Sequence, residues 1–181
     1  MDIHLQIIEE LKLVAKKVSK DEVAIFIQML QKAKSIFICG EGRSLLIGKA
    51  FAMRLMQAEF PVYVTGETVT PRIHNNDVLV VISGSGNTPT VEVIAKQAMQ
   101  AGAKIVCITA NRKSRIQRIA NHLLLIPAAT KNHLINECET IQPLSSQFDQ
   151  SALLLLDAIV IKLIEGRNKE ENMKNNHTNL Q

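Results

Sequence analysis

The chain is poor in aromatic residues: it has no Trp, one Tyr and five Phe among 181 residues. Proteins that hold single-stranded nucleic acid stack the bases on aromatic side chains, so this class is disfavoured. The formal net charge is only +4, and the sequence contains no dense basic stripe, which also argues against a nucleic-acid footprint. A mildly basic chain with few aromatic residues is better suited to an anionic small molecule.

Cysteine is also scarce, and the three residues form no C-x-x-C pair: Cys39, Cys107 and Cys138. We expect buried thiols in a reducing cytosol. The His and Cys residues lack the spacing of a zinc site, so no metal is expected. The N-terminal MDIHLQIIEE has no signal-peptide core, and the longest apolar stretch, 152–164, is too short to span a bilayer. The sequence therefore predicts a cytoplasmic protein that does not bind a membrane.

Short apolar runs alternate with segments of helical periodicity. Strands are expected at 35–39, 61–64, 78–82, 104–109 and 122–126, and helices at 3–18, 19–33, 44–58, 90–101, 114–120 and 146–165. Ser19 and Glu22 have the spacing of a capping box, and Gly166 suits the end of the last helix. This alternation predicts an α/β protein, a three-layer doubly wound fold with a five-stranded parallel sheet flanked by helices. One domain is expected over 1–166, followed by a polar tail over 167–181.

The strongest strand runs into a glycine-rich segment, Ser83-Gly84-Ser85-Gly86-Asn87-Thr88, that opens a helix. Glycines allow close approach of a ligand, and a helix N-terminus with free N–H groups attracts anions. The hydroxyls of Ser83, Ser85 and Thr88 add donors. The segment matches neither nucleotide-binding glycine motif, and it contains no lysine, so it suits a single terminal phosphate. The alternative is a tight strand-to-helix turn in which Ser and Thr only cap the helix.

A second glycine segment, Gly40-Glu41-Gly42-Arg43-Ser44, follows the first strand. Ligands of doubly wound folds lie beyond the carboxyl ends of the strands, where both segments belong. Arg43 and Ser44 are therefore candidate sugar contacts, although a plain turn with a surface Arg explains the pattern equally well. The connection over 127–145 is long for a compact domain, and its length suggests a function.

Several blocks together resemble one family. CGEGRSLLIGKAFAMRLM, GETVTP, SGSGNTPTV, TIQPLSSQFDQ and the terminal NHTNLQ occur in the order found in sugar isomerase (SIS) proteins, and especially in the 6-phospho-3-hexuloisomerases. The resemblance covers nearly the whole chain. It implies a flavodoxin-like parallel sheet, no cofactor, and interconversion of D-arabino-hex-3-ulose 6-phosphate and fructose 6-phosphate. It also implies a cytoplasmic homo-oligomer, a tetramer whose sites draw on more than one subunit, in the ribulose monophosphate pathway.

The resemblance also assigns binding residues. Those expected to hold the phosphate are Ser83, Gly84, Ser85 and Thr88, and those expected to contact the sugar are Gly42, Arg43 and Ser44. The isomerisation moves a proton between two carbons through a cis-enediol, so a base and a proton donor are needed.

Three residues are candidates for the proton transfers: Asp149, Glu67 and His177. Asp149 stands where the family usually has Glu, and it could instead only compensate the dipole of the helix that it begins. Glu67 could be a solvated loop carboxylate. His177 lies in the polar tail, which composition alone would describe as disordered. The resemblance instead predicts that the tail folds onto a neighbouring subunit and delivers His177 to that subunit's site.

Two further departures from the family pattern leave the activity open. Asn87 replaces a Glu at a position expected to face the sugar, and Gln181 replaces a terminal Glu. The alternatives to the hexuloisomerase activity are a phosphosugar-binding protein that senses without turnover and an isomerase of another ketose phosphate.

Overall fold

The computed structural model describes residues 2–131, 137–165 and 169–179. The elements follow in the order α1 (Ile3–Lys17), α2 (Lys20–Lys32), β1 (Ile36–Gly40), α3 (Gly42–Gln57), β2 (Val62–Val64), β3 (Val78–Ile82), α4 (Pro89–Gln100), β4 (Lys104–Thr109), η1 (Gln117–Ile119), β5 (His122–Leu125), α5 (Ser146–Ile164) and α6 (Lys169–Asn175). All strand pairs are parallel, in the order β2-β1-β3-β4-β5. The predicted fold class is confirmed.

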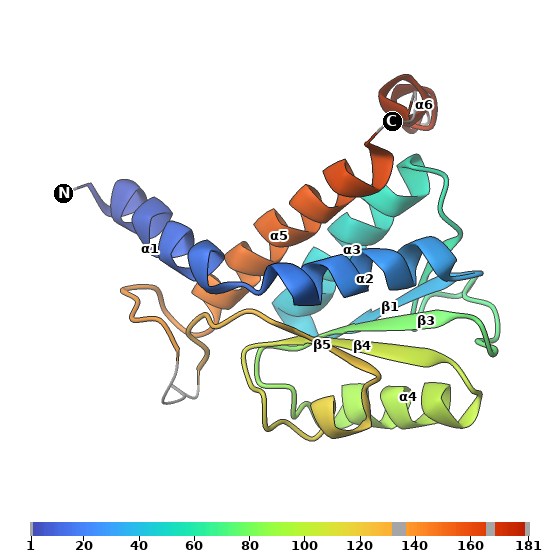
Figure 1. The fold of residues 1–181 in the computed structure, drawn as a ribbon, viewed down its shortest axis with the longest axis horizontal. Helices are drawn as coiled ribbons and strands as arrows, with labels where there is room; N and C mark the ends of the chain where they lie inside the picture. Colours follow the sequence, from blue (N-terminus) through green and yellow to red (C-terminus); the bar gives the residue numbers. More distant parts are fainter. Residues whose placement is uncertain (1, 132–136, 166–168, 180–181) are drawn as a thin grey trace.

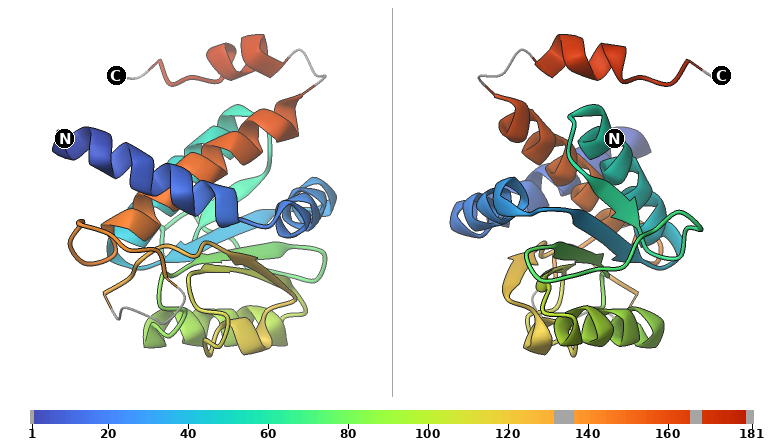
Figure 2. Two further views of the ribbon diagram at one scale, coloured as in Figure 1. Left: turned by 60° about the vertical axis from the view of Figure 1, so that its left-hand side comes forward. Right: turned by 90° about the vertical axis from the view of Figure 1, so that its right-hand side faces the viewer.

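The helices cover the two faces of the sheet unequally. Figure 1 shows α2, α3 and α5 on one face, with α1 against α5, whereas α4 and the short η1 lie on the other. Figure 2 shows the same three layers from two more sides. Across the described ranges, none of the helices combines the length and the apolar character that a membrane crossing requires.

The three central strands alternate between two cores because successive strand side chains point to opposite faces. Those that face α3 and α5 are Ile36, Ile38, Val78, Val80, Ile82, Val106 and Ile108. Those that face α4 are Phe37, Cys39, Leu79, Val81, Ile105 and Cys107. All of these side chains are at most 2% exposed, which explains why the sequence shows continuous apolar runs in place of a polar alternation. The three cysteines are buried, as expected.

The predicted elements are confirmed with boundaries within two residues, apart from one. The helix expected over 114–120 is only a single 3-10 turn, η1. Ser114 in this segment is fully buried, and its hydroxyl accepts a hydrogen bond from the Gln117 N–H, so the chain is held in a turn. Gly166, the expected helix end, lies outside the described residues.

The expected capping box is only half formed. The Ser19 hydroxyl accepts a hydrogen bond from the Glu22 N–H at 3.3 Å, as predicted. The Glu22 carboxylate does not return the bond but reaches across to the sheet edge, where it accepts from the Leu125 N–H at 2.8 Å and pairs with Arg112 at 2.8 Å. A long-range tie between α2 and β5 thus replaces the local one.

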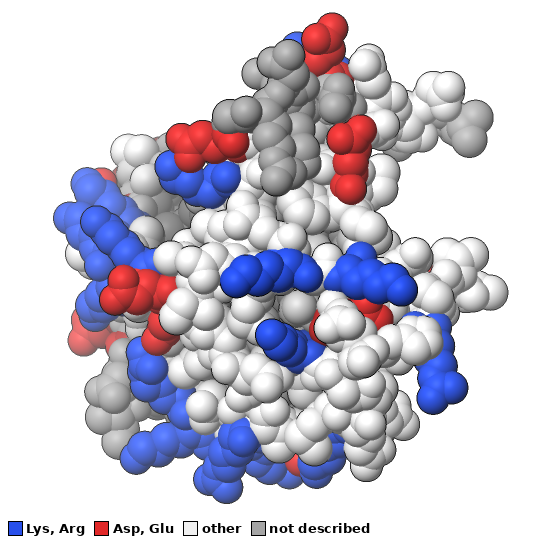
Figure 3. Space-filling view, turned by 45° about the vertical axis from the view of Figure 1, so that its right-hand side comes forward, with Lys and Arg blue, Asp and Glu red and all other residues white. Residues whose placement is uncertain are grey.

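The charged surface differs between the layers. Figure 3 shows Lys and Arg side chains gathered along the lower margin of the face drawn there, over the layer formed by α4 and η1. Two of the basic groups near η1 are neutralised by ion pairs, Arg112 with Glu22 and Arg115 with Glu92. Part of the positive charge of this layer is therefore compensated within the chain.

Candidate active site

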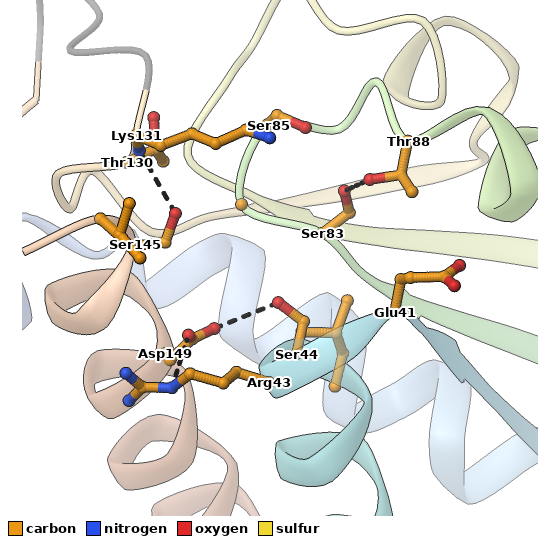
Figure 4. Close-up of a pocket in the computed structure, with 13 residues that line it drawn as sticks. Glu41, Arg43, Ser44, Ser83, Ser85, Thr88, Thr130, Lys131, Ser145 and Asp149 are labelled. Atoms are coloured by element: carbon orange, nitrogen blue, oxygen red, sulfur yellow. Dashed lines mark hydrogen bonds and ion pairs between the residues drawn. The ribbon is translucent and has the colours of Figure 1, made fainter.

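The strand order reverses between β1 and β3, and the two glycine segments follow these neighbouring strands. Ligands of doubly wound folds bind at this reversal, beyond the carboxyl ends of the strands. A pocket of about 260 Å³ opens there. It is lined by Glu41, Arg43, Ser44, Ile82, Ser83, Gly84, Ser85, Thr88, Thr130, Lys131, Leu144, Ser145 and Asp149 (Figure 4).

The serine loop, residues 83–88, presents both hydroxyls and main-chain donors to the pocket. The Ser83 hydroxyl accepts from the Gly86 N–H and lies 3.1 Å from the Thr88 hydroxyl. The Ser85 hydroxyl accepts from the Asn87 N–H at 3.2 Å. These bonds shape the turn, but Thr88 makes no side-chain capping bond to α4.

Donors remain available in the same loop. The N–H groups of Gly84, Ser85 and Thr88 have no hydrogen-bond partner among the described residues. Free main-chain donors at the start of a helix bind oxyanions well, because the helix dipole places partial positive charge there. The serine loop is therefore a candidate anion site, with main-chain donors that the turn itself does not use.

Opposite the serine loop lies a carboxylate cluster. Asp149, on the first turn of α5, is only 3% exposed. The Ser44 hydroxyl donates to one of its oxygens at 3.1 Å, and Arg43 Nε lies 3.3 Å from the other. Arg43 also donates to the Ser146 hydroxyl at 2.8 Å. The amino ends of α3 and α5 are thus joined through polar side chains that face the pocket (Figure 4).

The surroundings of Asp149 make its carboxyl a weaker acid than an exposed aspartate. Burial raises the pKa of the Asp149 carboxyl above its ordinary value, and the hydrogen bond from Ser44 and the charge of Arg43 oppose this rise only in part. A carboxyl group with a raised pKa, placed at a pocket, is a candidate for proton transfer.

Sequence reasoning did not identify the wall that the 127–145 connection contributes. Thr130, Lys131, Leu144 and Ser145, named here the pocket wall, come from the two ends of this connection. The only signal was the unusual length of the segment. Its residues have no periodicity that would locate them in space, so no local pattern could assign individual positions.

Glu10 on α1 holds the pocket wall in place. Its carboxylate accepts hydrogen bonds from the Thr140 hydroxyl, the Ile141 N–H at 2.9 Å, and the side-chain amides of Gln142 and Gln147 at 3.2 and 3.3 Å. Gln147 in turn accepts from the Ala129 N–H at 2.7 Å, beside Thr130. Burial alone would raise the pKa of the Glu10 carboxyl, but these four hydrogen bonds outweigh it and lower the pKa.

Removing this carboxylate should loosen the wall. We expect Glu10→Ala to lower the free energy of unfolding by about 1–2 kcal/mol at neutral pH, allowing for solvent screening at a partly exposed group. Because the pKa is lowered in the folded state, this stability is present above the ordinary Glu pKa and is lost as the pH falls through the lowered one. Urea unfolding at neutral and acid pH should therefore show the two proteins converging in acid.

Glu9→Ala is the matched control, because Glu9 is on the same helix and pairs only with the exposed Lys12, at 3.1 Å, among the described residues. We expect it to change stability by less than about 0.5 kcal/mol. Equal losses in both variants at every pH would contradict the anchoring role of Glu10.

The structure does not bring every predicted residue to this pocket. Gly42 begins α3 with a φ of 55° but does not itself line the pocket. Glu67 lies in the loop after β2, where it pairs with Lys49 at 2.6 Å and lines a separate hollow against α3. The Asn87 side chain, expected to face the sugar, accepts from the Arg115 N–H at 2.8 Å and is not part of the lining. Gln181 lies outside the described residues.

His177 follows α6, and α6 packs on α3 of the same chain (Figure 1). The Asn176 amide donates to the Gln57 carbonyl, at the carboxyl end of α3, at 3.1 Å. The pocket lies at the amino end of this helix, so about 20 Å of helix separates the exposed His177 from the pocket of its own chain.

No group of three or more His, Cys, Asp or Glu side chains is arranged to hold a metal ion within residues 2–131, 137–165 and 169–179. The pocket has free main-chain donors on one side and a buried carboxylate on the other. This combination suits proton transfer on a phosphorylated ligand.

Comparison with known proteins places the chain in one family. Residues 29–154 match the SIS domain. The 3-hexulose-6-phosphate isomerase of Bacillus subtilis is 33% identical over 177 residues, which are 97% of this chain and 96% of that protein. A crystal structure from Methanococcus jannaschii, from which a molecular function of 3-hexulose-6-phosphate isomerase was inferred, has a TM-score of 0.84 at 31% identity, covering 99% of this chain and 98% of that one. The chain belongs to the SIS domain family.

Proposed function

We propose that this protein is an isomerase that interconverts D-arabino-hex-3-ulose 6-phosphate and fructose 6-phosphate. The observation that carries the proposal is the position of Asp149, a buried carboxylate across one pocket from the free donors of the serine loop. Relatives named 3-hexulose-6-phosphate isomerase, at 33–36% identity over most of the chain, support the choice of substrate. We place the reaction in the cytoplasm, in the ribulose monophosphate pathway that the sequence resemblance implies.

The reaction needs only proton transfers. A base removes the proton from C2 of the hexulose phosphate while the C3 carbonyl oxygen gains a proton, which gives the cis-enediol. The C2 hydroxyl then loses its proton as C3 receives one, so the carbonyl has moved from C3 to C2. One base on one face of the enediol can serve both carbons.

The pocket residues divide this work. The amides and hydroxyls of the serine loop hold the phosphate, and this fixes where C2 and C3 of the sugar lie in the pocket. Asp149 takes the proton from carbon. Ser44 and Arg43 favour the ionised form of Asp149, against the effect of burial, and orient its oxygens. Charge that develops on the enediol oxygens needs a donor, and hydroxyl or cationic groups at the pocket can supply it.

Purified protein incubated with hex-3-ulose 6-phosphate should form fructose 6-phosphate, measured by a coupled assay for glucose 6-phosphate. Fructose 6-phosphate in deuterated water should also exchange a carbon-bound hydrogen, which reports enediol formation directly. Saturable binding of fructose 6-phosphate without turnover or exchange would overturn the proposal in favour of a sensing protein. Exchange with another ketose phosphate alone would assign a different substrate.

We further propose that the working form is a homo-oligomer, a tetramer, whose neighbouring subunits supply Glu67 and His177 to each site. Exposed apolar side chains on three helices support an association surface: Ile3, Ile8, Leu13, Leu46, Met53, Met56, Leu154 and Ile161. The pocket volume of about 260 Å³ is below the roughly 300–1,000 Å³ of complete small-molecule sites. A further wall from another subunit would complete it.

Mixing two inactive variants tests this arrangement. We expect Asp149→Asn and His177→Ala each to lose most activity, and refolded mixtures of the two to recover it at about a quarter of the sites, where an intact Asp149 meets an intact His177. Mixtures of Asp149→Asn with Ser85→Ala serve as the control, because one chain supplies both residues and no site is repaired. Absence of recovery in the first mixture, or full activity of His177→Ala, would reject a role for a neighbour's His177.

A further inference from the structure

We infer that Lys131 is a phosphate-binding residue that neutralises the sugar phosphate at the serine loop and sets its orientation. The inference rests on the proposed function and specifies how the same pocket recognises its ligand. It departs from the sequence analysis, in which the phosphate is held by main-chain and hydroxyl donors with no cation.

Lys131 belongs to the pocket, although it comes 43 positions after Thr88 in the sequence. Figure 4 shows its side chain extending toward Ser85. Its main chain is fixed from the other side, since the Lys131 N–H donates to the Ser145 hydroxyl at 3.3 Å. The backbone is thus tied near the start of α5, while the side chain extends to the serine loop.

The ammonium group of Lys131 makes no ion pair or hydrogen bond with any described residue. The other cation of the pocket is already engaged. Arg43 Nε lies 3.3 Å from the Asp149 carboxylate, and Arg43 Nη1 donates to the Ser146 hydroxyl at 2.8 Å. Lys131 is therefore the lining cation that is available to a ligand.

The charges that line the pocket show why a cation is needed. Glu41 and Asp149 carry negative charge when ionised, and Arg43 and Lys131 carry positive charge. The lining is neutral with Lys131 and has a net charge of −1 without it. A phosphate monoester is close to a dianion at neutral pH, because its second pKa is about 6. Without Lys131, this ligand would enter a pocket of its own sign.

The two cations also lie on opposite sides of the pocket. Lys131 and Ser85 occupy one side, and Arg43, Ser44 and Asp149 the other (Figure 4). The phosphate end of the ligand is drawn to Lys131, because the Arg43 charge is satisfied by Asp149. The carbons to be deprotonated then point to Asp149. Lys131 thus contributes both affinity and direction.

The test compares Lys131→Gln, Lys131→Arg and a remote control, Lys104→Gln. Lys104 begins β4, at the amino ends of the strands, whereas the pocket lies beyond their carboxyl ends. Its side chain is exposed. Isothermal titration with fructose 6-phosphate and with unphosphorylated fructose reports binding whether or not the protein turns over hexulose phosphate. We expect Lys131→Gln to raise the Kd of fructose 6-phosphate by about 10- to 100-fold, as for loss of a charge-assisted contact.

The pattern across variants decides the inference. Lys131→Arg should keep most of the affinity, Lys104→Gln should match the wild type, and Lys131→Gln should leave the weak binding of fructose unchanged. In an active enzyme, Lys131→Gln should raise KM far more than it lowers kcat. An unchanged Kd in Lys131→Gln, or an equal loss in Lys104→Gln, would overturn the role of Lys131. Absence of turnover with the Kd pattern intact would overturn only the proposed reaction.

Discussion

Asp149→Asn is expected to lower kcat by about 10²- to 10⁴-fold, the range typical for loss of a general base. The amide has nearly the same volume as the carboxylate and can still accept the hydrogen bond from Ser44, but it cannot take a proton from carbon. The Kd of fructose 6-phosphate should change little, because the proposed binding mode holds the phosphate on the other side of the pocket. Steady-state kinetics and titration calorimetry of the same preparation separate the two quantities.

The pH dependence provides a second readout of Asp149. Burial, opposed in part by Ser44 and Arg43, raises the pKa of this carboxyl. A base must be ionised, so kcat/KM of the wild type should rise with pH through that raised pKa and then level off. The residual activity of Asp149→Asn should lack this acidic limb.

Loss of stability cannot explain the expected effect. A carboxyl whose pKa is raised by folding destabilises the folded state at pH values above that pKa, so removing its charge does not cost stability at neutral pH. Arg43 loses its ion partner, but its side chain is 58% exposed and can be solvated. Full turnover by a folded Asp149→Asn variant would remove this residue from the mechanism.

Gly86→Ala is expected to lower the free energy of unfolding by about 2–5 kcal/mol, from backbone strain and overpacking together. Gly86 has a φ of +63°, which residues with a Cβ rarely adopt. An added Cβ would lie 2.3 Å from the Ser114 hydroxyl oxygen and 2.9 Å from that of Thr109. Both of these hydroxyls are fully buried, so neither can easily move aside. The melting temperature should fall by roughly 5–20 °C for a chain of this size.

Gly66→Ala separates the two causes. Gly66 has a φ of +88°, but an added Cβ there would meet no atom within 4 Å. It should therefore cost only the backbone strain, about 1 kcal/mol or slightly more. Calorimetric melting of both variants measures the difference, which reports the close packing of the serine loop against the segment after β4. Equal losses in the two variants would contradict that packing.

The strands could be predicted because each is a continuous apolar run, and the glycine segments because they directly follow two of those runs. The rule that ligands bind beyond the carboxyl ends of parallel strands indicated the serine loop, Arg43 and Ser44, and residues of both segments line the pocket. Asp149, which only the family resemblance indicated, lines the same pocket from the opposite side. Lys131 and the pocket wall could not be predicted, since a long connection without periodicity has no preferred position until its partners are known. Those partners are remote: Glu10 and Gln147 are 137 residues apart.

Asn87 shows a different limit. Its place at the start of α4 was evident, but the direction of its side chain depends on Arg115, which a sequence pattern cannot place. In the same way, Glu22 has the spacing of a local capping box, but its carboxylate bonds instead to the Leu125 N–H and to Arg112. Local rules gave positions along the chain in both cases, and tertiary contacts decided what the side chains touch.

α1 packs against α5, and the hydrogen bonds of Glu10 also link it to the connection over 127–145. The helix carries exposed apolar side chains, including Ile3, Ile8 and Leu13. The same helix carries the Glu10 carboxylate, which accepts hydrogen bonds from the side chains of Gln142 and Gln147. Because these residues belong to or adjoin the connection that forms the pocket wall, we expect a contact made on the outer face of α1 to influence the shape of the pocket.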